Sequence, residues 1–290
     1  MNFATPSEVC SGSLQTWKTK ANLPLGPMFV LGILAGAYIA LAAQGATMVT
    51  HDIAGVGVGR FLSGVIFATG LIMVVIAGAE LFTGNIMIWI GVLDGSVTLG
   101  KMLRNWFWVY VANFVGSLLV VYLIYLSGLW TFNNNMVGAA VIKTAVAKNS
   151  LTFVGALSRG ILCNWLVCLA VWMAFAGKDV ISKIFGIFFP IMMFVASNFE
   201  HSIANMYYIP AGILAKNIPA ALEASRVGAK VDVLTWGSFL QINLLPVTLG
   251  NIIGAGLFVA TFYWFAYLHG KTTVAAAAEP EKAAAAAAGR

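Results

Sequence analysis

Long apolar runs separated by short polar segments dominate this sequence. About 20 consecutive apolar residues are enough to cross a lipid bilayer as a helix. Two runs are too long for one straight crossing, and the last begins either near residue 238 or at Pro246 after an interfacial stretch. The pattern predicts an all-α membrane protein with six transmembrane helices, at residues 26–49, 61–93, 105–128, 152–176, 181–214 and 238–268.

The composition supports a membrane protein. Of 290 residues, 60% are hydrophobic and 9% are charged, whereas about a quarter of the residues in a soluble domain are charged. Residues 1–24 are polar and lack the apolar core of a cleavable signal peptide. We therefore expect an N-terminal cytoplasmic segment, 1–25, a six-helix transmembrane domain, 26–270, and a low-complexity cytoplasmic tail, 271–290, that is disordered or a frayed helix.

The distribution of lysine and arginine predicts the orientation. Placing both termini in the cytoplasm puts nine basic residues inside and six outside, and cytoplasmic segments carry the excess of basic residues. We expect a multi-pass protein of the cell (inner or plasma) membrane. The net charge of +6 is scattered over several loops and indicates no nucleic-acid partner. Cys10, Cys163 and Cys168 form no CxxC pair, so we expect structural thiols, no metal site and no cofactor.

The two halves of the chain resemble each other in three short segments. GILAGA at 32–37 matches GILCNW at 160–165, ELFTGN at 80–85 matches EHSIAN at 200–205, and NFVG at 113–116 matches NIIG at 251–254. The order is the same, and the offsets are 128, 120 and 138 residues. Each half would contain three spans, an odd number, so the second copy must lie upside down. We predict two inverted three-helix repeats.

The middle match falls inside the two overlong runs. Glu80 and Thr83-Gly84 would interrupt the second run, and Ser197-Asn198 would interrupt the fifth. Non-helical backbone at membrane depth is tolerated only against protein or a water-filled path. Broken spans at corresponding positions therefore point to a transport site between the repeats.

The chemistry of such a site favours anions. A helix that restarts inside the membrane presents free N–H groups, which bind anions without a fixed cation. His201 is the only histidine at the centre of a span, and an ordinary pKa of about 6.5 lets it exchange a proton near neutral pH. Because ionisable residues inside spans are usually functional, we expect His201 to lend a proton to a small weak-acid anion. The alternative is a core histidine bonded to a backbone carbonyl.

Other polar residues near the breaks have structural interpretations. Glu80 and Glu200 are each followed five residues later by an asparagine, Asn85 or Asn205. We expect these four to hold the breaks, with the carboxylates accepting hydrogen bonds from free N–H groups. Asn164 could orient a loop or line the path. Bulky apolar residues near the breaks, which would either pack or exclude water from a pore, are Phe67, Leu71, Leu81, Phe82 and Phe194.

Other function classes fit less well. The sequence lacks the Asn-Pro-Ala pair of water and glycerol channels and the second pore histidine of an ammonium channel or haem site. An intramembrane hydrolase using His201 and Ser202 would need two adjacent helical residues to face each other, which they do not, and there is no GxSxG motif. We therefore expect a transporter and no enzymatic activity.

Three segments carry a family resemblance. AGAELFTGN at 77–85, LCNWLVCLAVWMA at 162–174 and NFEHSIANM at 198–206 resemble the signature segments of the formate/nitrite transporter family. The resemblance covers roughly residues 5–270 and leaves out the tail. It implies an aquaporin-like fold with spans two and five broken, assembled as a homopentamer with one pore in each subunit.

The resemblance also implies roles for single residues. His201 matches the central pore histidine of the family, Thr83 its partner on an Ω-shaped loop, and Asn164 an asparagine near that histidine. Lys148 matches a lysine that makes the outer vestibule electropositive. The five bulky apolar residues named above fall where the family forms two hydrophobic constrictions.

A channel for small monovalent anions of weak acids follows from the resemblance. GIFFPIMMFV and FYWFAYLHG look most similar to formate channels, whereas ELFTGN and CNWLVCLAVWMA are shared with nitrite carriers. Formate is the expected substrate, with nitrite or hydrosulfide as alternatives. The expected partners are this anion, the lipid bilayer and identical subunits.

Overall fold

The computed structural model describes residues 3–270, so the expectation for the 271–290 tail lies outside the described residues. The described part is helical, with one isolated β-bridge between Phe3 and Gly177. Its helices are α1 Pro6–Ala21, α2 Leu25–Thr50, α3 Val56–Met73, α4 Phe82–Asn85, α5 Trp89–Leu93, α6 Leu99–Leu126, α7 Met136–Asn149, α8 Phe153–Ala176, α9 Val180–Ala196, α10 Ser202–Ala215, α11 Pro219–Ser225, α12 Trp236–Ser238, α13 Leu245–Ala255 and α14 Phe262–Tyr267. The π-helical segments Val74–Gly78, Phe239–Leu244 and Gly256–Thr261 extend α3 and join α12, α13 and α14.

Five continuous helices are long and apolar enough to span a membrane. They are Leu25–Thr50, Val56–Gly78, Leu99–Leu126, Phe153–Ala176 and Trp236–Tyr267. The last is helical from Trp236, so its helix begins before both of the starts that the sequence allowed for the span. Of two shorter apolar helices, Phe82–Leu93 occupies the rest of the predicted second run, and Val180–Ala196 occupies the first half of the fifth. The second half of the fifth run is α10. The protein is therefore an all-helical, multi-pass membrane protein.

Both overlong runs are interrupted, as predicted. The first helical stretch of the second run ends at Gly78, and α4 begins at Phe82. Glu80 lies in this interruption as predicted, whereas Thr83 and Gly84 already belong to α4. In the fifth run, α9 ends at Ala196 and α10 begins at Ser202. We call residues 79–81 the first break and residues 197–201 the second break.

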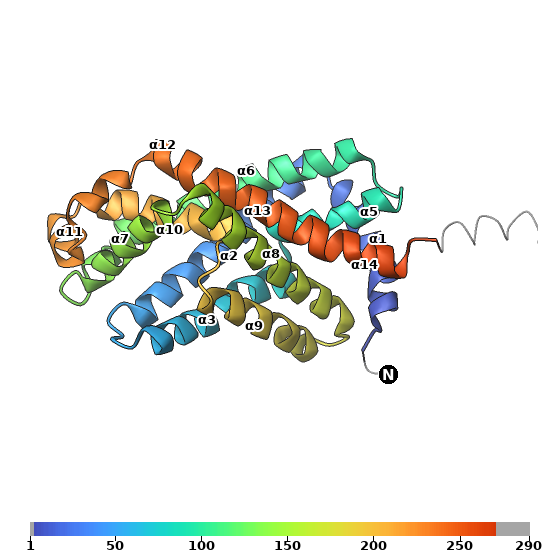
Figure 1. The fold of residues 1–290 in the computed structure, drawn as a ribbon, viewed down its shortest axis with the longest axis horizontal. Coiled ribbons are helices and arrows are strands. Elements are labelled where there is room, and N and C mark those ends of the chain that lie inside the picture. Colours follow the sequence, from blue (N-terminus) through green and yellow to red (C-terminus); the bar gives the residue numbers. More distant parts are fainter. Residues whose placement is uncertain (1–2, 271–290) are drawn as a thin grey trace, which may run out of the picture.

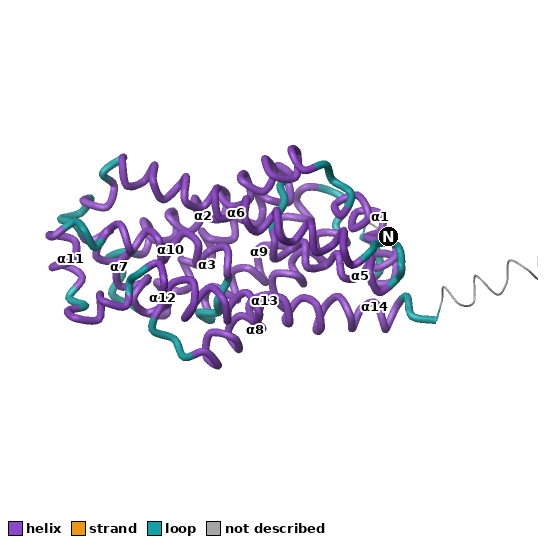
Figure 2. The backbone as a smooth tube through the Cα atoms, turned by 90° about the horizontal axis from the view of Figure 1, so that it is seen from above, coloured by secondary structure: helices purple, strands orange, loops and turns teal. Residues whose placement is uncertain are grey.

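The half-helices after the two breaks lead to opposite ends of the molecule. Figure 1 shows α10 on the side of α7 and α11, whereas α5 lies at the other end with α1 and α14. The N-terminal helix and the end of α14 lie at the same end of the molecule, as the view from above also shows (Figure 2). The breaks therefore lie between these two ends, in the interior.

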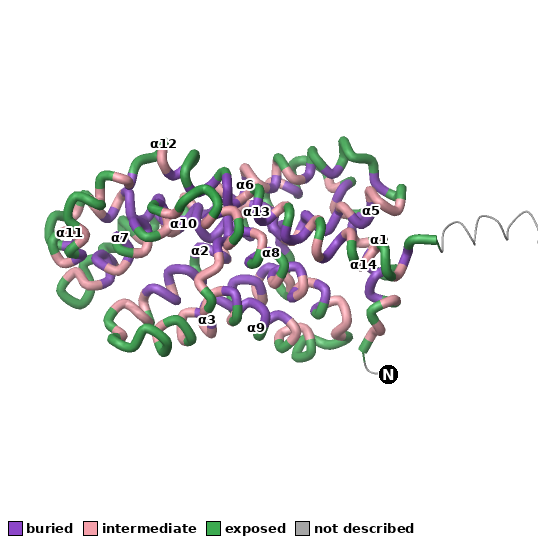
Figure 3. The backbone as a smooth tube through the Cα atoms, viewed as in Figure 1, coloured by how far each residue is buried: buried purple, intermediate pink, exposed green. Residues whose placement is uncertain are grey.

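Glycines let the long helices approach closely. A Cβ on Gly36 of α2 would lie 2.0 Å from the Asn113 carbonyl oxygen of α6, and one on Gly254 of α13 would lie 2.2 Å from the Ile161 carbonyl oxygen of α8. Small residues at helix crossings are typical of membrane proteins, and these two glycines lie at such crossings. Buried positions concentrate in the middle of the molecule, near α2, α8 and α10, with exposed positions at the loop ends (Figure 3).

Candidate functional site: two helix breaks around a histidine

Both breaks have the same backbone design. The backbone enters the left-handed region as the helix before each break ends. This happens at Gly78, with φ of 85°, for the first break and at Asn198, with φ of 58°, for the second. Glycine and asparagine adopt this conformation at low cost. The backbone N–H of Glu80 then donates to the Leu31 carbonyl at 3.2 Å, and that of Glu200 donates to the Arg159 carbonyl at 3.2 Å. Each break is thus tied to a neighbouring long helix.

The two glutamates bind side chains at equivalent positions. Glu80 Oε1 lies 2.6 Å from Lys20 Nζ, and its Oε2 accepts a hydrogen bond from Asn85 at 2.6 Å. Glu200 Oε1 lies 2.9 Å from Lys148 Nζ, and its Oε2 accepts from Asn205 at 2.7 Å. The carboxylates therefore bond to a lysine and an asparagine, and not to the backbone N–H groups that the sequence led us to expect.

Two further asparagines take those backbone groups. Asn113 Oδ1 accepts from the Phe82 N–H at 2.9 Å, and Asn113 Nδ2 donates to the carbonyls of Gly32 and Glu80. Asn251 does the same in the second half, accepting from the Ser202 N–H at 2.9 Å and donating to the carbonyls of Gly160 and Glu200. One buried amide thus closes each break.

A second pair of asparagines completes the pattern. Asn105 accepts from Asn85 and donates to the Lys20 carbonyl, and Asn243 accepts from Asn205 and donates to the Lys148 carbonyl. The sequence analysis missed Asn105, Asn113, Asn243, Asn251 and Lys20 as site residues. The signal was present, because Lys20 and Lys148 are 128 residues apart and both asparagine pairs are 138 apart, the offsets of the matched segments.

His201 caps the helix that follows the second break. Its Nδ1 accepts a hydrogen bond from the Ala204 N–H at 3.1 Å, so the neutral ring carries its proton on Nε2. Nε2 lies 2.9 Å from Thr83 Oγ1 and donates to it in this tautomer. The Thr83 hydroxyl proton is then available to another acceptor. The expected partners His201 and Thr83 are therefore in contact, joining the two breaks.

Asn164 donates hydrogen bonds to the backbone of α4 and α13. Its Nδ2 donates to the Thr83 carbonyl at 3.2 Å and to the Asn251 carbonyl at 2.8 Å. Cys168 Sγ also lies 3.3 Å from the Thr83 carbonyl. Both side chains therefore bond to the carbonyl of the residue whose hydroxyl contacts His201.

Four of the five bulky apolar residues line two cavities in pairs, and one of these pairs contacts the histidine. The Phe67 and Phe194 rings meet edge to face at a centroid distance of 5.7 Å, and Phe194 stacks on His201 at 5.9 Å. Leu71, one helical turn beyond Phe67, lies with Leu81 at a different cavity. Phe82 is separate, because its ring packs on Tyr110 at 4.8 Å and on Trp106 at 6.2 Å.

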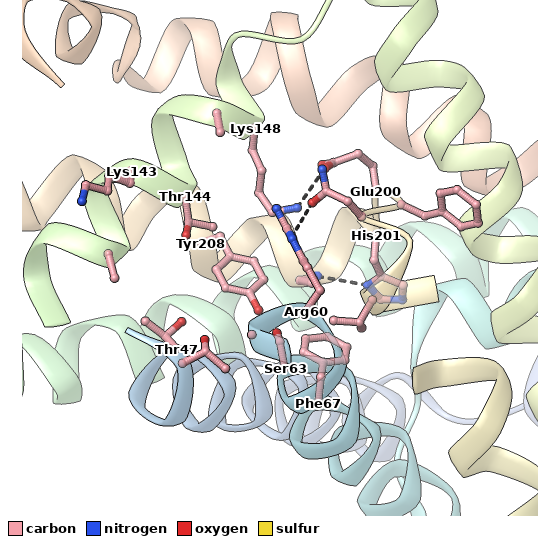
Figure 4. A pocket seen from close by; sticks show the side chains of 18 of the residues that line it. Thr47, Arg60, Ser63, Phe67, Lys143, Thr144, Lys148, Glu200, His201 and Tyr208 are labelled. Atoms are coloured by element: carbon pink, nitrogen blue, oxygen red, sulfur yellow. Dashed lines mark hydrogen bonds and ion pairs between the residues drawn. The ribbon is translucent and has the colours of Figure 1, made fainter. Parts of the chain in front are cut away.

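Two cavities end at these pairs. The first, of about 530 Å³, reaches Phe67, Phe194 and His201, and we call it the His201 cavity (Figure 4). The second, of about 390 Å³, reaches Leu71 and Leu81, and we call it the Leu81 cavity. Lys148 and Glu200 line the first cavity, and Lys20 and Glu80 line the second. Each cavity therefore contains one of the two lysine–glutamate pairs.

Comparison with known proteins identifies the family. Residues 7–265 match the model of the formate/nitrite transporter family. The chain is 39% identical over 285 residues to a probable formate transporter of Methanothermobacter thermautotrophicus, covering 92% of this chain and 98% of that protein. It is 41% identical over 245 residues to the formate channel FocA of Escherichia coli, covering 83% of this chain and 86% of that channel.

Solved structures agree with this result. A pentameric formate channel with formate bound superposes with a TM-score of 0.75 at 36% identity, covering 84% of this chain and 98% of that one. An ion channel described as a member of the FNT family superposes with a TM-score of 0.73 at 31% identity, covering 90% and 98%. With its helical membrane fold and a match across most of its length, the chain belongs to the formate/nitrite transporter family.

Proposed function

We propose that this protein is a channel for small monovalent weak-acid anions, with formate as its main substrate and His201 as the proton donor. One observation carries this proposal: a buried imidazole bonds to Thr83 and stacks on Phe194 at one of two cavities, and each cavity is lined by a lysine and a pair of bulky apolar side chains. Formate is favoured because similar channels are named for it. Nitrite and hydrosulfide are the alternatives that the experiment below distinguishes.

The proposed topology is two inverted three-helix repeats forming an aquaporin-like unit with six crossings. The interrupted fifth run would supply the crossing that the five long helices lack. The equivalent bonding of Glu80 and Glu200, at an offset of 120 residues, supports the repeat. The excess of basic residues supports cytoplasmic termini in the plasma membrane, so that the His201 cavity opens to the outside.

We also propose a homopentamer in which each subunit has its own pore. Support comes from the similar structure described as a pentameric formate channel. The path proposed above lies within a single chain, between Lys148 in one cavity and Lys20 in the other. No residue of a neighbouring subunit is needed to complete it.

In the proposed path, an anion enters the His201 cavity, loses water at Phe67 and Phe194 and reaches His201. The bare charge costs several kcal/mol in such an apolar neck. The neutral ring holds one proton on Nε2, so His201 must first take a second proton, which displaces the Ala204 N–H from Nδ1. The imidazolium then gives one proton to formate, leaving neutral imidazole and formic acid. The neutral acid passes Leu71 and Leu81 and ionises beside Lys20.

Uptake by proteoliposomes tests this function. We would compare formate, nitrite and hydrosulfide at two pH values, for the wild type and for His201→Phe. We expect formate to enter fastest, with faster uptake at the lower pH, and the variant to lose both rate and pH dependence. Unchanged rate and pH dependence in the variant would refute the proton role. Faster uptake of nitrite or hydrosulfide would refute formate as the main substrate.

A further inference from the structure

The His201 cavity holds more positive charge than its carboxylate can neutralise. Lining residues include the cations Arg60, Lys143, Lys148 and Arg159 and a single carboxylate, Glu200. Glu200 is already paired with Lys148 at 2.9 Å. The other three cations have no carboxylate partner among the described residues, so this cavity favours a negatively charged ligand beyond the Lys148 position.

Arg60 is the cation best placed to bind that ligand in a fixed position. It projects from α3, and its Nη1 donates to Asn198 Oδ1 at 2.6 Å. Asn198 lies in the second break, three positions before His201. Figure 4 shows the Arg60 and Lys148 side chains reaching toward this segment from two different helices. One guanidinium N–H thus bonds to Asn198 and fixes the position of the Arg60 guanidinium. Its other N–H groups remain available to a ligand.

Hydroxyl groups in the same cavity also lack partners. The hydroxyls of Ser63 and Tyr208 line the cavity, and neither forms a hydrogen bond with any described residue. By contrast, Thr47 and Thr50 donate to the carbonyls of their own helix. Ser63 lies three residues after Arg60, so both lie on one face of α3. The cavity thus presents two free hydroxyl donors beside a guanidinium.

We propose that Arg60, Ser63 and Tyr208 form an anion subsite in the His201 cavity that selects anions with two oxygen atoms before they reach Phe67. The guanidinium fork fits two oxygens of one planar anion. Formate and nitrite present such a pair, whereas hydrosulfide and halides present a single atom. This inference rests on the proposed function, because it assigns the selectivity of that channel to a step before the histidine.

Binding to the purified protein tests the subsite without requiring transport. Saturation-transfer NMR on the formate proton gives the dissociation constant, and competition by nitrite and hydrosulfide gives theirs. Arg60→Lys keeps the charge and removes the fork. We expect it to weaken the binding of formate and nitrite about fivefold and to leave hydrosulfide competition unchanged. The fivefold change corresponds to the loss of one charge-assisted hydrogen bond at a partly exposed site. Equal weakening of all three anions, or of none, would overturn the subsite.

Two sets of variants separate binding from structure. Asn198→Gly keeps the left-handed backbone but frees Arg60, so formate binding should persist; a loss equal to that of Arg60→Lys would mean that Arg60 only holds the break. The double variant Ser63→Ala with Tyr208→Phe leaves the break untouched and should also weaken formate, and unchanged binding would refute the three-residue subsite. Lys143→Gln removes a charge from the same cavity and should change the binding of all three anions by a similar factor. Wild-type protein that binds formate through Arg60 but does not transport it would refute the proposed function and support the subsite.

Discussion

Asn251→Leu is the sharpest test of how the second break is held. The amide accepts from the Ser202 N–H at 2.9 Å and donates to the Gly160 and Glu200 carbonyls at 2.9 and 3.0 Å. Leucine has a similar size but no polar atoms. It leaves the Ser202 N–H and the Glu200 carbonyl without their partner in a buried place. The backbone would therefore either rearrange or leave these two groups without a hydrogen bond.

The expected cost follows from these orphaned groups. Each buried unsatisfied group costs about 1–3 kcal/mol, so the two together cost about 2–6 kcal/mol. At a few degrees per kcal/mol, the melting temperature in detergent should fall by about 5 °C or more. Formate uptake should also fall, because Ser202 follows His201 directly. Thermal unfolding followed by tryptophan fluorescence measures the first quantity, and proteoliposome flux measures the second.

Two control variants show whether the effect of Asn251→Leu comes from the loss of these hydrogen bonds. Asn113→Leu removes the equivalent amide from the first break and should cost a similar amount, since its three hydrogen bonds are of 2.7–2.9 Å. Thr69→Leu changes an exposed hydroxyl that bonds only its own helix, at the Ile66 carbonyl, and should have little effect. If Asn251→Leu melts and conducts like the wild type, the asparagine does not hold the break and our reasoning is wrong.

Three further predictions concern packing, pH and selectivity. Gly254→Ala should lower the melting temperature strongly, because the new Cβ would lie 2.2 Å from the Ile161 carbonyl oxygen, a backbone atom that cannot move aside. Asp179 accepts hydrogen bonds from the backbone and side chain of Ser182, which hold the pKa of that carboxyl below its usual value. Its stabilising effect is therefore full above about pH 4 and is lost as the pH falls through the lowered pKa, so Asp179→Ala should reduce the melting temperature at pH 7 but not in strong acid. Phe67→Ala removes a ring that is 1% exposed and should raise acetate uptake relative to formate uptake by widening the neck.

Each of these predictions has a matched control. Gly26→Ala places a Cβ where nothing lies within 4 Å and should leave the melting temperature unchanged. A pH-independent effect of Asp179→Ala would contradict the capping explanation. Phe107→Ala removes an exposed ring that lines neither cavity and should not change anion selectivity. An unchanged acetate-to-formate ratio in Phe67→Ala would mean that this ring does not narrow the path.

The sequence predicted the helices and the breaks because their signals are local. Apolar run length gives the spans, and Glu80 and Glu200 mark interruptions because a carboxylate inside an apolar run must have partners. Those partners were less predictable. Lys20 lies in a polar segment beside Lys18, and only its spacing of 128 residues from Lys148 distinguishes it. Its role depends on α1 folding back, which brings its Nζ to within 2.6 Å of Glu80. Long-range contacts of this kind leave no local pattern.

Side-chain direction was also beyond local reasoning. Phe82 and Leu81 are adjacent, yet Leu81 reaches a cavity while Phe82 packs on Tyr110 of α6. The orientation of α4, a helix of four residues, decides between them, and that orientation is set by the Asn113 contact to its first N–H group. The asymmetry between Leu81 and His201 can be read from the sequence, because they occupy the second positions of the matched segments ELFTGN and EHSIAN.

The bonding of the two breaks has a consequence for how the chain is assembled during synthesis. The lysine, glutamate and asparagine partners named above for the first break lie between Lys20 and Asn113, and those for the second lie between Lys148 and Asn251. In addition, Arg60 of the first half donates to Asn198 in the second break. The first half can therefore complete its break before the second half leaves the ribosome. The contact between Thr83 and His201 joins the halves and forms only when they meet. Substitutions at the contact between the halves can thus change the transport rate while the hydrogen bonds within each break are kept.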